Sequence, residues 1–147
     1  MKIYISSSWK NQENVRKMAT KLRLDGHKVY DFTDRECRKT PEFPHDKRPE
    51  SFDAKKHKSY RLHLESAPQL YAAVMNNQEA IRWCDLVILL LPCGNEAHAD
   101  WGYGVGLGKA SIITGHPREG DYSATHLWAD KIIDDPEDVY AFIRENY

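Results

Sequence analysis

The chain has 147 residues, of which 41% are hydrophobic and 29% are charged. This length is typical of one domain with a core large enough to fold without disulfides, so we expect a single domain over residues 1–147. The formal net charge of -1 argues against a broad cationic surface for nucleic acid or for anionic membranes.

The first 32 residues predict a strand–helix–strand unit. Apolar residues alternate in Lys2–Ser6, which predicts a strand. Asn11–Leu24 has apolar residues at helical spacing and ends at Asp25 and Gly26. Lys28–Phe32 predicts the second strand. The whole unit has the length that a parallel crossover needs.

A polar insertion follows over Thr33–Ser66, with nine Lys or Arg and seven Asp or Glu residues. A connection of this length needs an explanation. Two interpretations stay open. The insertion is either a solvated segment with one short helix, or a lid over a ligand site with basic residues near an anion.

The second half of the chain alternates helices and strands. Helices are expected over Pro68–Cys84, Asn95–Lys109 and Pro136–Asn146, with a helical turn at Thr125–Ala129, and strands over Asp85–Leu91, Lys109–Thr114 and Lys131–Ile133. The expected apolar stripe of the first of these helices contains Leu70, Ala73, Val74, Asn77, Ala80 and Ile81.

This order of elements predicts an α/β fold. We expect a flavodoxin-like, open, parallel five-stranded sheet in the order 2-1-3-4-5, with helices on both faces. Ligands of such sheets bind beyond the carboxyl ends of the strands, where the strand order reverses. Ser6–Asn11 and Pro92–Asp100 should therefore line the site, while Asp85, at the opposite end of its strand, should be structural.

The predicted helix over Asn95–Lys109 carries four glycines at alternate positions. Each costs about 0.5–1 kcal/mol relative to alanine within a helix. Gly102 and Gly106 share one face, and Gly104 and Gly108 share another. The glycines indicate either close packing of the helix or room for a ligand or a second subunit.

Two carboxylates lie four residues apart at the start of this helix, so Glu96 and Asp100 share a face. The helix N-terminus should lower their pKa values, and an ionised carboxylate suits a glycosyl nucleophile or oxocarbenium stabiliser. Glu96 could instead simply complement the helix dipole, and Asp100 could be a hydrogen-bonded structural residue. Asn77 could point along the sheet toward a ligand.

The turn after the first strand offers a second set of candidates. Ser6, Ser7 and Ser8 suit either a phosphate or a helix cap. Trp9 could stack on a base or pack in the protein.

The sulfur- and imidazole-bearing residues point to neither a metal nor a disulfide. Cys93, His98 and Asp100 match no standard zinc spacing, and an activated Cys93 would have only His98 as a local base. Three widely spaced cysteines are typical of cytosolic thiols. We therefore expect a cytoplasmic protein with no metal, cofactor or export segment, and the longest apolar run, Leu86–Leu91, is too short to cross a membrane.

Three segments resemble the nucleoside 2-deoxyribosyltransferase superfamily, including its relatives that hydrolyse nucleotide N-glycosidic bonds. They are KIYISSSW, NNQEAIRWCDLVILLLP and CGNEAHADWGYGVGLGKA, the last being similar to the glycine-rich helix of a phage and bacterial branch. The resemblance covers nearly everything outside the insertion. It implies a small nucleoside or nucleotide substrate and a homodimer or larger assembly in which a neighbouring chain helps to close each site.

The resemblance also implies roles for individual residues. Asp100 matches the nucleophile that attacks C1′, although the superfamily has Glu there, and Asn77 matches an acidic residue that assists the leaving base. Glu96 could supply the missing carboxylate. Other substrate contacts are expected from Ser6, Ser7, Ser8, Trp9, Cys93, Gly94 and His98. The two altered acids leave open an enzyme that cleaves or transfers at an N-glycosidic bond, or a weakly active or inactive nucleotide-binding sensor of the same fold.

Overall fold

The computed structural model describes residues 1–34, 59–65, 68–119 and 122–147, with side chains from residue 71 onward in the helix that begins at 68. The strands are β1 (Lys2–Ser6), β2 (Lys28–Asp31), β3 (Leu86–Leu90), β4 (Ala110–Thr114) and β5 (Lys131–Ile133). The α-helices are α1 (Gln12–Leu24), α2 (Tyr60–Glu65), α3 (Pro68–Trp83), α4 (Asn95–Gly106) and α5 (Asp138–Asn146). Two short 3-10 helices are η1 (Trp9–Asn11) and η3 (Ala124–Trp128).

The five strands form one parallel sheet in the order β2-β1-β3-β4-β5, which confirms the predicted fold class and strand order. The order reverses between β1 and β3, so this is the switch point. All five residues of β3 are buried, as expected of a central strand that helices cover on both faces. The Asp85 carboxylate accepts a hydrogen bond from the Lys2 amide at 2.8 Å at the opposite end of the sheet, in keeping with its expected structural role.

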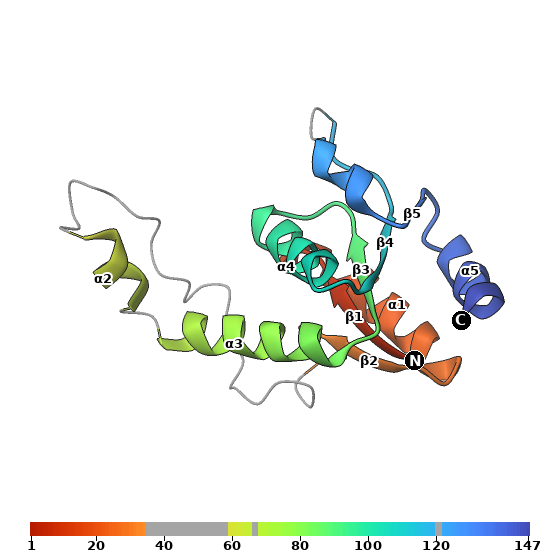
Figure 1. Ribbon diagram of the computed structural model, residues 1–147, viewed down its shortest axis with the longest axis horizontal. Helices are drawn as coiled ribbons and strands as arrows, with labels where there is room; N and C mark the ends of the chain where they lie inside the picture. The colour runs from red at the N-terminus through yellow and green to blue at the C-terminus, as the bar shows by residue number, and fades with distance from the viewer. Residues whose placement is uncertain (35–58, 66–67, 120–121) are drawn as a thin grey trace.

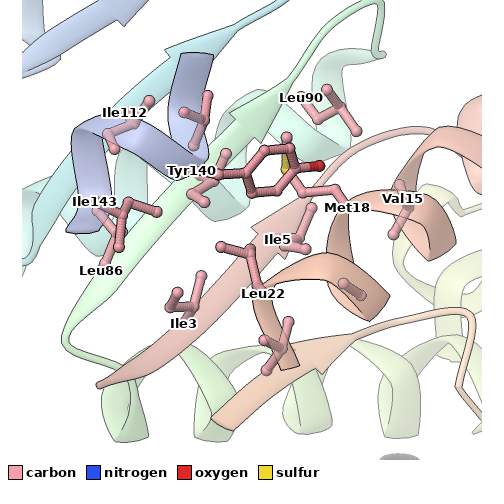
Figure 2. Close-up of a cluster of buried hydrophobic side chains, with 14 of the residues drawn as sticks. Ile3, Ile5, Val15, Met18, Leu22, Leu86, Leu90, Ile112, Tyr140 and Ile143 are labelled. Atoms are coloured by element: carbon pink, nitrogen blue, oxygen red, sulfur yellow. The ribbon is translucent and has the colours of Figure 1, made fainter. Parts of the chain in front are cut away.

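Two apolar clusters place the helices on the sheet. The first joins residues of α1 and α5 to one face of β1, β3 and β4, and Figure 2 shows Met18 and Leu22 beside Ile5, and Ile143 beside Leu86. The second joins α3 and α4 to the other face, as the order of layers in Figure 1 shows. Asn77 on α3 and Asp100 on α4, both predicted for the site, therefore come from the helices on this face.

The glycines of α4 have different roles. A Cβ on Gly104 would lie 2.5 Å from Cγ1 of Val87, so this glycine lets the helix approach β3. A Cβ on Gly102 or Gly106 would meet nothing within 4 Å. Gly108 follows the helix with φ +72°, and the Lys109 amide donates to the Gly104 carbonyl at 3.1 Å, which is a Schellman ending. The predicted pairing of Gly104 and Gly108 on one helix face is therefore wrong, because the helix stops at Gly106.

The apolar stripe of α3 is only partly buried. Ala80 and Ile81 lie in the core, but Val74 is 51% exposed, so its predicted place on a buried stripe is wrong. Figure 1 shows the reason, because the first half of α3 and all of α2 extend away from the sheet. Helix α2 is a short helix within the insertion. Most of the residues on which the choice between a lid and a solvated segment depends lie outside the described ranges. Within the described ranges, no helix has both the length and the apolar character needed to cross a bilayer.

Candidate active site

The turns after β1 and β3 lie against each other at the switch point. The Ser6 hydroxyl donates to the Ala97 carbonyl at 2.9 Å, and the Ser7 hydroxyl donates to the Leu90 carbonyl at 2.7 Å. The Asn11 side chain donates to the Leu91 carbonyl at 3.3 Å. The structure thus brings together the two segments that topology selects.

The same bonds bear on the role of the serines and of Trp9. Ser6 is buried, and its hydroxyl hydrogen already goes to a carbonyl rather than toward a ligand. Ser8 accepts a hydrogen bond from the Lys10 amide at 3.2 Å and caps η1. The Trp9 ring packs edge-on against Phe32, with ring centroids 5.1 Å apart. These contacts favour capping and packing over a phosphate cradle or base stacking.

Asp100 accepts two hydrogen bonds on one carboxylate oxygen. The Tyr4 hydroxyl, on β1, donates to Oδ2 at 2.9 Å. Nδ2 of Asn77, on α3, donates to the same Oδ2 at 2.9 Å. No hydrogen bond joins Oδ1 to any residue that the structure describes. The carboxylate is therefore held from two sides through one oxygen, while the other oxygen accepts no hydrogen bond from a described residue.

A second tyrosine extends this arrangement. The Tyr30 hydroxyl donates to Oδ1 of Asn77 at 3.3 Å, and the rings of Tyr4 and Tyr30 stack with centroids 5.5 Å apart. We call Tyr4, Tyr30, Asn77 and Asp100 the carboxylate network. The sequence reasoning missed both tyrosines. A signal was available, because each stands at the same position of its strand and the parallel register pairs Tyr4 with Tyr30.

Burial controls the electrostatics of this network. It raises the pKa of the Asp100 carboxyl, the hydrogen bonds from Tyr4 and Asn77 lower it, and the nearby charge of Glu96 raises it further. The net direction is upward, so the predicted lowering by the helix N-terminus is wrong for Asp100. Burial, followed by the charge of Asp100, also raises the pKa of Tyr4 well above its ordinary value. The phenol therefore keeps its proton and remains a hydrogen-bond donor.

Glu96 lies in the first turn of α4, one helical turn before Asp100. Its side chain is exposed and makes no hydrogen bond or ion pair with a described residue. This position suits a charge that complements the helix dipole. It also leaves the carboxylate accessible, so a part in the chemistry remains a prediction.

Cys93 and His98 lie together beside a pocket of about 420 Å³ that Asp100 does not line. Sγ of Cys93 is 3.5 Å from Nδ1 of His98. Burial raises the pKa of Cys93 to about 12, so the side chain is a thiol at neutral pH, which disfavours a thiolate nucleophile. Gly94 is the N-cap of α4. The described part of the chain contains no group of three or more His, Cys, Asp or Glu suited to a metal.

The fold of this chain is similar to that of two solved enzyme structures. No family model matches the sequence, and no curated protein matches it. A similar solved structure is a 2-deoxyribosyltransferase from Bacillus psychrosaccharolyticus, with a TM-score of 0.62 and 21% identity over 100% of this chain and 92% of that chain. Another is the CMP N-glycosidase BcmB of Clostridium botulinum, with a TM-score of 0.52 and 13% identity over 99% of this chain and 98% of that chain.

The chain therefore shares the fold of these two proteins. This likeness of fold supports the resemblance that the three sequence segments suggested. Helix α4, which contains Gly102, Gly104 and Gly106, carries the one carboxylate of the carboxylate network.

Proposed function

We propose that this protein cleaves or transfers at the N-glycosidic bond of a nucleoside or nucleotide, with Asp100 as the nucleophile. The observation that carries the proposal is the fixation of Oδ2 by Tyr4 and Asn77 while Oδ1 accepts no hydrogen bond from a described residue. A nucleophile needs a fixed carboxylate with one oxygen directed to the reacting carbon. The structural neighbours, one named a 2-deoxyribosyltransferase and the other a CMP N-glycosidase, support the substrate class.

The proposed reaction has two steps. Oδ1 of Asp100 attacks C1′ of the sugar, the bond from C1′ to the base nitrogen breaks, and the base leaves with that electron pair. Water or a second base then attacks C1′ and gives up its proton to Glu96, while the bond from C1′ to Asp100 breaks with its electron pair on the carboxylate. The first step requires an ionised Asp100, so the hydrogen bonds from Tyr4 and Asn77 matter because they oppose the effect of burial on its pKa.

The leaving base needs a proton, and Asn77 is an amide that cannot provide one. We propose that Asn77 positions Asp100 and contacts the base. Glu96, accessible and one turn away, is the proposed second carboxylate. Other substrate contacts are proposed from the segments that meet at the switch point, and a second copy of the chain is proposed to complete the site.

The test is release of free base, measured by chromatography, from a panel of nucleosides, deoxynucleosides and their monophosphates. We expect release by the wild-type chain and a loss of about 10³-fold or more in Asp100→Asn, as is usual when a nucleophile is removed. Asp138→Asn, an exposed acid at the start of α5, is the matched control and should retain full rate.

The sensor alternative predicts a different result from the same panel. A ligand that raises the melting temperature, is recovered intact after long incubation and gives no free base would replace the enzyme proposal with a binding function. Equal release by wild type and Asp100→Asn would show that another group does the chemistry.

A further inference from the structure

A separate pocket of about 420 Å³ lies on the other flank of α4 from Asp100. Side chains two positions apart on a helix point about 200° apart. Asp100 accordingly contacts Tyr4 of β1, whereas His98 contacts His126 of η3. Its lining includes Cys93, Asn95, His98, Arg118, Tyr122 and His126.

The charges around this pocket suit an anion. Arg118 and two histidines line it, and none of its nine described lining residues is Asp or Glu. Asn95 is the first residue of α4, and the N-cap before it offers no side-chain hydrogen bond to the free backbone N–H groups of the first turn. Such a helix end adds a favourable partial charge for an anion that arginine already attracts.

Hydrogen bonds determine the protonation of the two histidines. Nδ1 of His98 lies 2.9 Å from the Gly94 carbonyl, which can only accept, so Nδ1 carries the proton. The Nε2 atoms of His98 and His126 are 2.9 Å apart, and one of them must donate. When both rings are neutral, His98 Nε2 is the acceptor and His126 Nε2 the donor. Nδ1 of His126 then has no proton and no partner among the described residues.

An additional proton is therefore accepted on Nδ1 of His126. A proton on His98 Nε2 would oppose the N–H of His126, whereas protonated His126 keeps every existing hydrogen bond. Burial, followed by the His98 charge, lowers the pKa of His126, which favours the neutral ring near pH 7. The surrounding groups are the Trp101 ring and, from the pocket lining, Cys93, Arg118 and Tyr122. No carboxylate among them competes with a bound anion.

We propose that this pocket binds a phosphate monoester, with Arg118 and His126 as its cationic contacts. A volume of about 420 Å³ lies in the range of small-molecule sites, so it admits an organic group beside the phosphate. Binding of the anion favours protonation of His126, and this couples ligand binding to proton uptake. The site does not depend on the reaction proposed for Asp100. Its phosphate belongs either to a nucleotide substrate or to a separate phosphorylated ligand.

Titration calorimetry with inorganic phosphate at pH 7 tests the site. We expect saturable binding by wild type and an affinity about tenfold lower, or worse, in Arg118→Gln, since hydrogen bonds to a charged group are of this strength. Arg144→Gln, an exposed arginine at the end of α5, should bind as wild type does. Absence of binding at millimolar phosphate, or equal affinity in Arg118→Gln, would overturn the proposal. An equal loss of affinity in Arg144→Gln would also overturn it, because the effect would then come from the net charge of the protein and not from the pocket.

Sulfate tests the proton linkage, because its own charge is constant between pH 8 and pH 6. We expect wild type to bind sulfate several-fold more tightly at pH 6 than at pH 8, because binding takes up a proton on His126 while the pH lies above the pKa of that ring in the free protein; the gain is at most about tenfold per pH unit. His126→Gln should lose this pH dependence. His116→Gln, an exposed histidine outside the pocket lining, should keep it. A pH dependence that survives in His126→Gln would exclude His126 as the titrating contact.

Two further measurements separate the sources of the phosphate. If it belongs to the substrate, Arg118→Gln raises KM for a nucleoside monophosphate and leaves KM for the nucleoside unchanged. If it belongs to another ligand, both KM values stay constant while phosphate binding falls. Asp100→Asn should bind phosphate as wild type does, so the pocket can be established even if no base is released.

Discussion

Asp100 combines burial with a fixed hydrogen-bond geometry, and the two have opposite consequences for the carboxylate. Burial disfavours the charge, while the donors from Tyr4 and Asn77 favour it. A purely structural residue at this position would be more stable as a neutral amide, whereas a nucleophile must be charged. A substitution that removes the charge of Asp100 should therefore change stability and activity in opposite directions, and both can be measured.

Asp100→Asn should stabilise the protein at neutral pH while abolishing base release. The folded-state pKa of Asp100 is raised, so its contribution to stability is present at low pH and lost as the pH rises through that value. The amide carries no charge and keeps an oxygen for both donors. We expect a melting temperature higher by a few degrees at pH 7, since about 1 kcal/mol shifts it by about 2–4 °C at this size, and no gain at pH 3. A lower melting temperature at pH 7 would contradict the burial argument.

Tyr4→Phe should shift the pH dependence of base release. The Tyr4 hydroxyl donates to ionised Asp100 and lowers its pKa, so its removal should raise that pKa and move the acid limb of the pH–rate profile to higher pH. The rate at neutral pH should fall about tenfold, the equivalent of one such hydrogen bond. Tyr30→Phe is the matched control, because its hydroxyl contacts Asn77 and not Asp100. The acid limb of the pH–rate profile should move less in Tyr30→Phe than in Tyr4→Phe.

At the scale of the element, one close contact determines how near α4 lies to the sheet, and one glycine determines where the helix ends. Gly104 allows α4 to pack on Val87 of β3, which places Asp100 within reach of Tyr4. Gly108 ends the helix through its positive φ. Gly104 and Gly108, which look alike in the sequence, therefore have separate physical roles.

Gly104→Ala and Gly102→Ala should have opposite effects on stability. The new methyl group at 104 would overlap Val87, and overpacking of this kind costs about 1–3 kcal/mol. The methyl group at 102 meets open space and gains up to about 1 kcal/mol of helix propensity. Urea unfolding of both variants, under conditions where each is monomeric, measures the difference. A stable Gly104→Ala would show that α4 can move away from β3.

At the scale of the whole molecule, several of the exposed large apolar side chains gather in two regions. Tyr60, Leu62 and Leu64 on α2 and Tyr71 and Val74 on α3 form one, and Tyr122, Leu127 and Trp128 around η3 form the other. Exposed apolar patches of this kind are typical of protein–protein contacts. They support the proposed homo-oligomer.

Light scattering coupled to gel filtration should give a mass of at least two chains. The substitution Leu62→Glu, at an exposed position of α2, should shift the distribution toward monomer without changing the far-ultraviolet spectrum. Leu24→Glu, equally apolar and exposed at the end of α1 but outside both regions, should not. A wild-type chain that is monomeric at every concentration would contradict the prediction.

The sequence alone was sufficient to predict the fold, because local hydrophobic patterns predict the strands and helices, and their order along the chain predicts the sheet. Alternation predicted β1 with its observed bounds, and β5 was also predicted with its observed bounds. The apolar run predicted β3 as a buried central strand, and the order of elements predicted the strand order. The insertion carried no such periodicity and could not be interpreted.

Only the tertiary structure decided which side chains meet. The carboxylate network joins β1, β2, α3 and α4, and its members are up to 96 positions apart, so no spacing rule connects Tyr4 with Asp100. The direction of the Asp100 pKa was likewise outside the sequence, since the helix end predicts a lowering while burial by other elements raises it. The pairing of His98 with His126 depends on where η3 folds against α4. Local order determines the elements, and contacts between distant elements determine the chemistry.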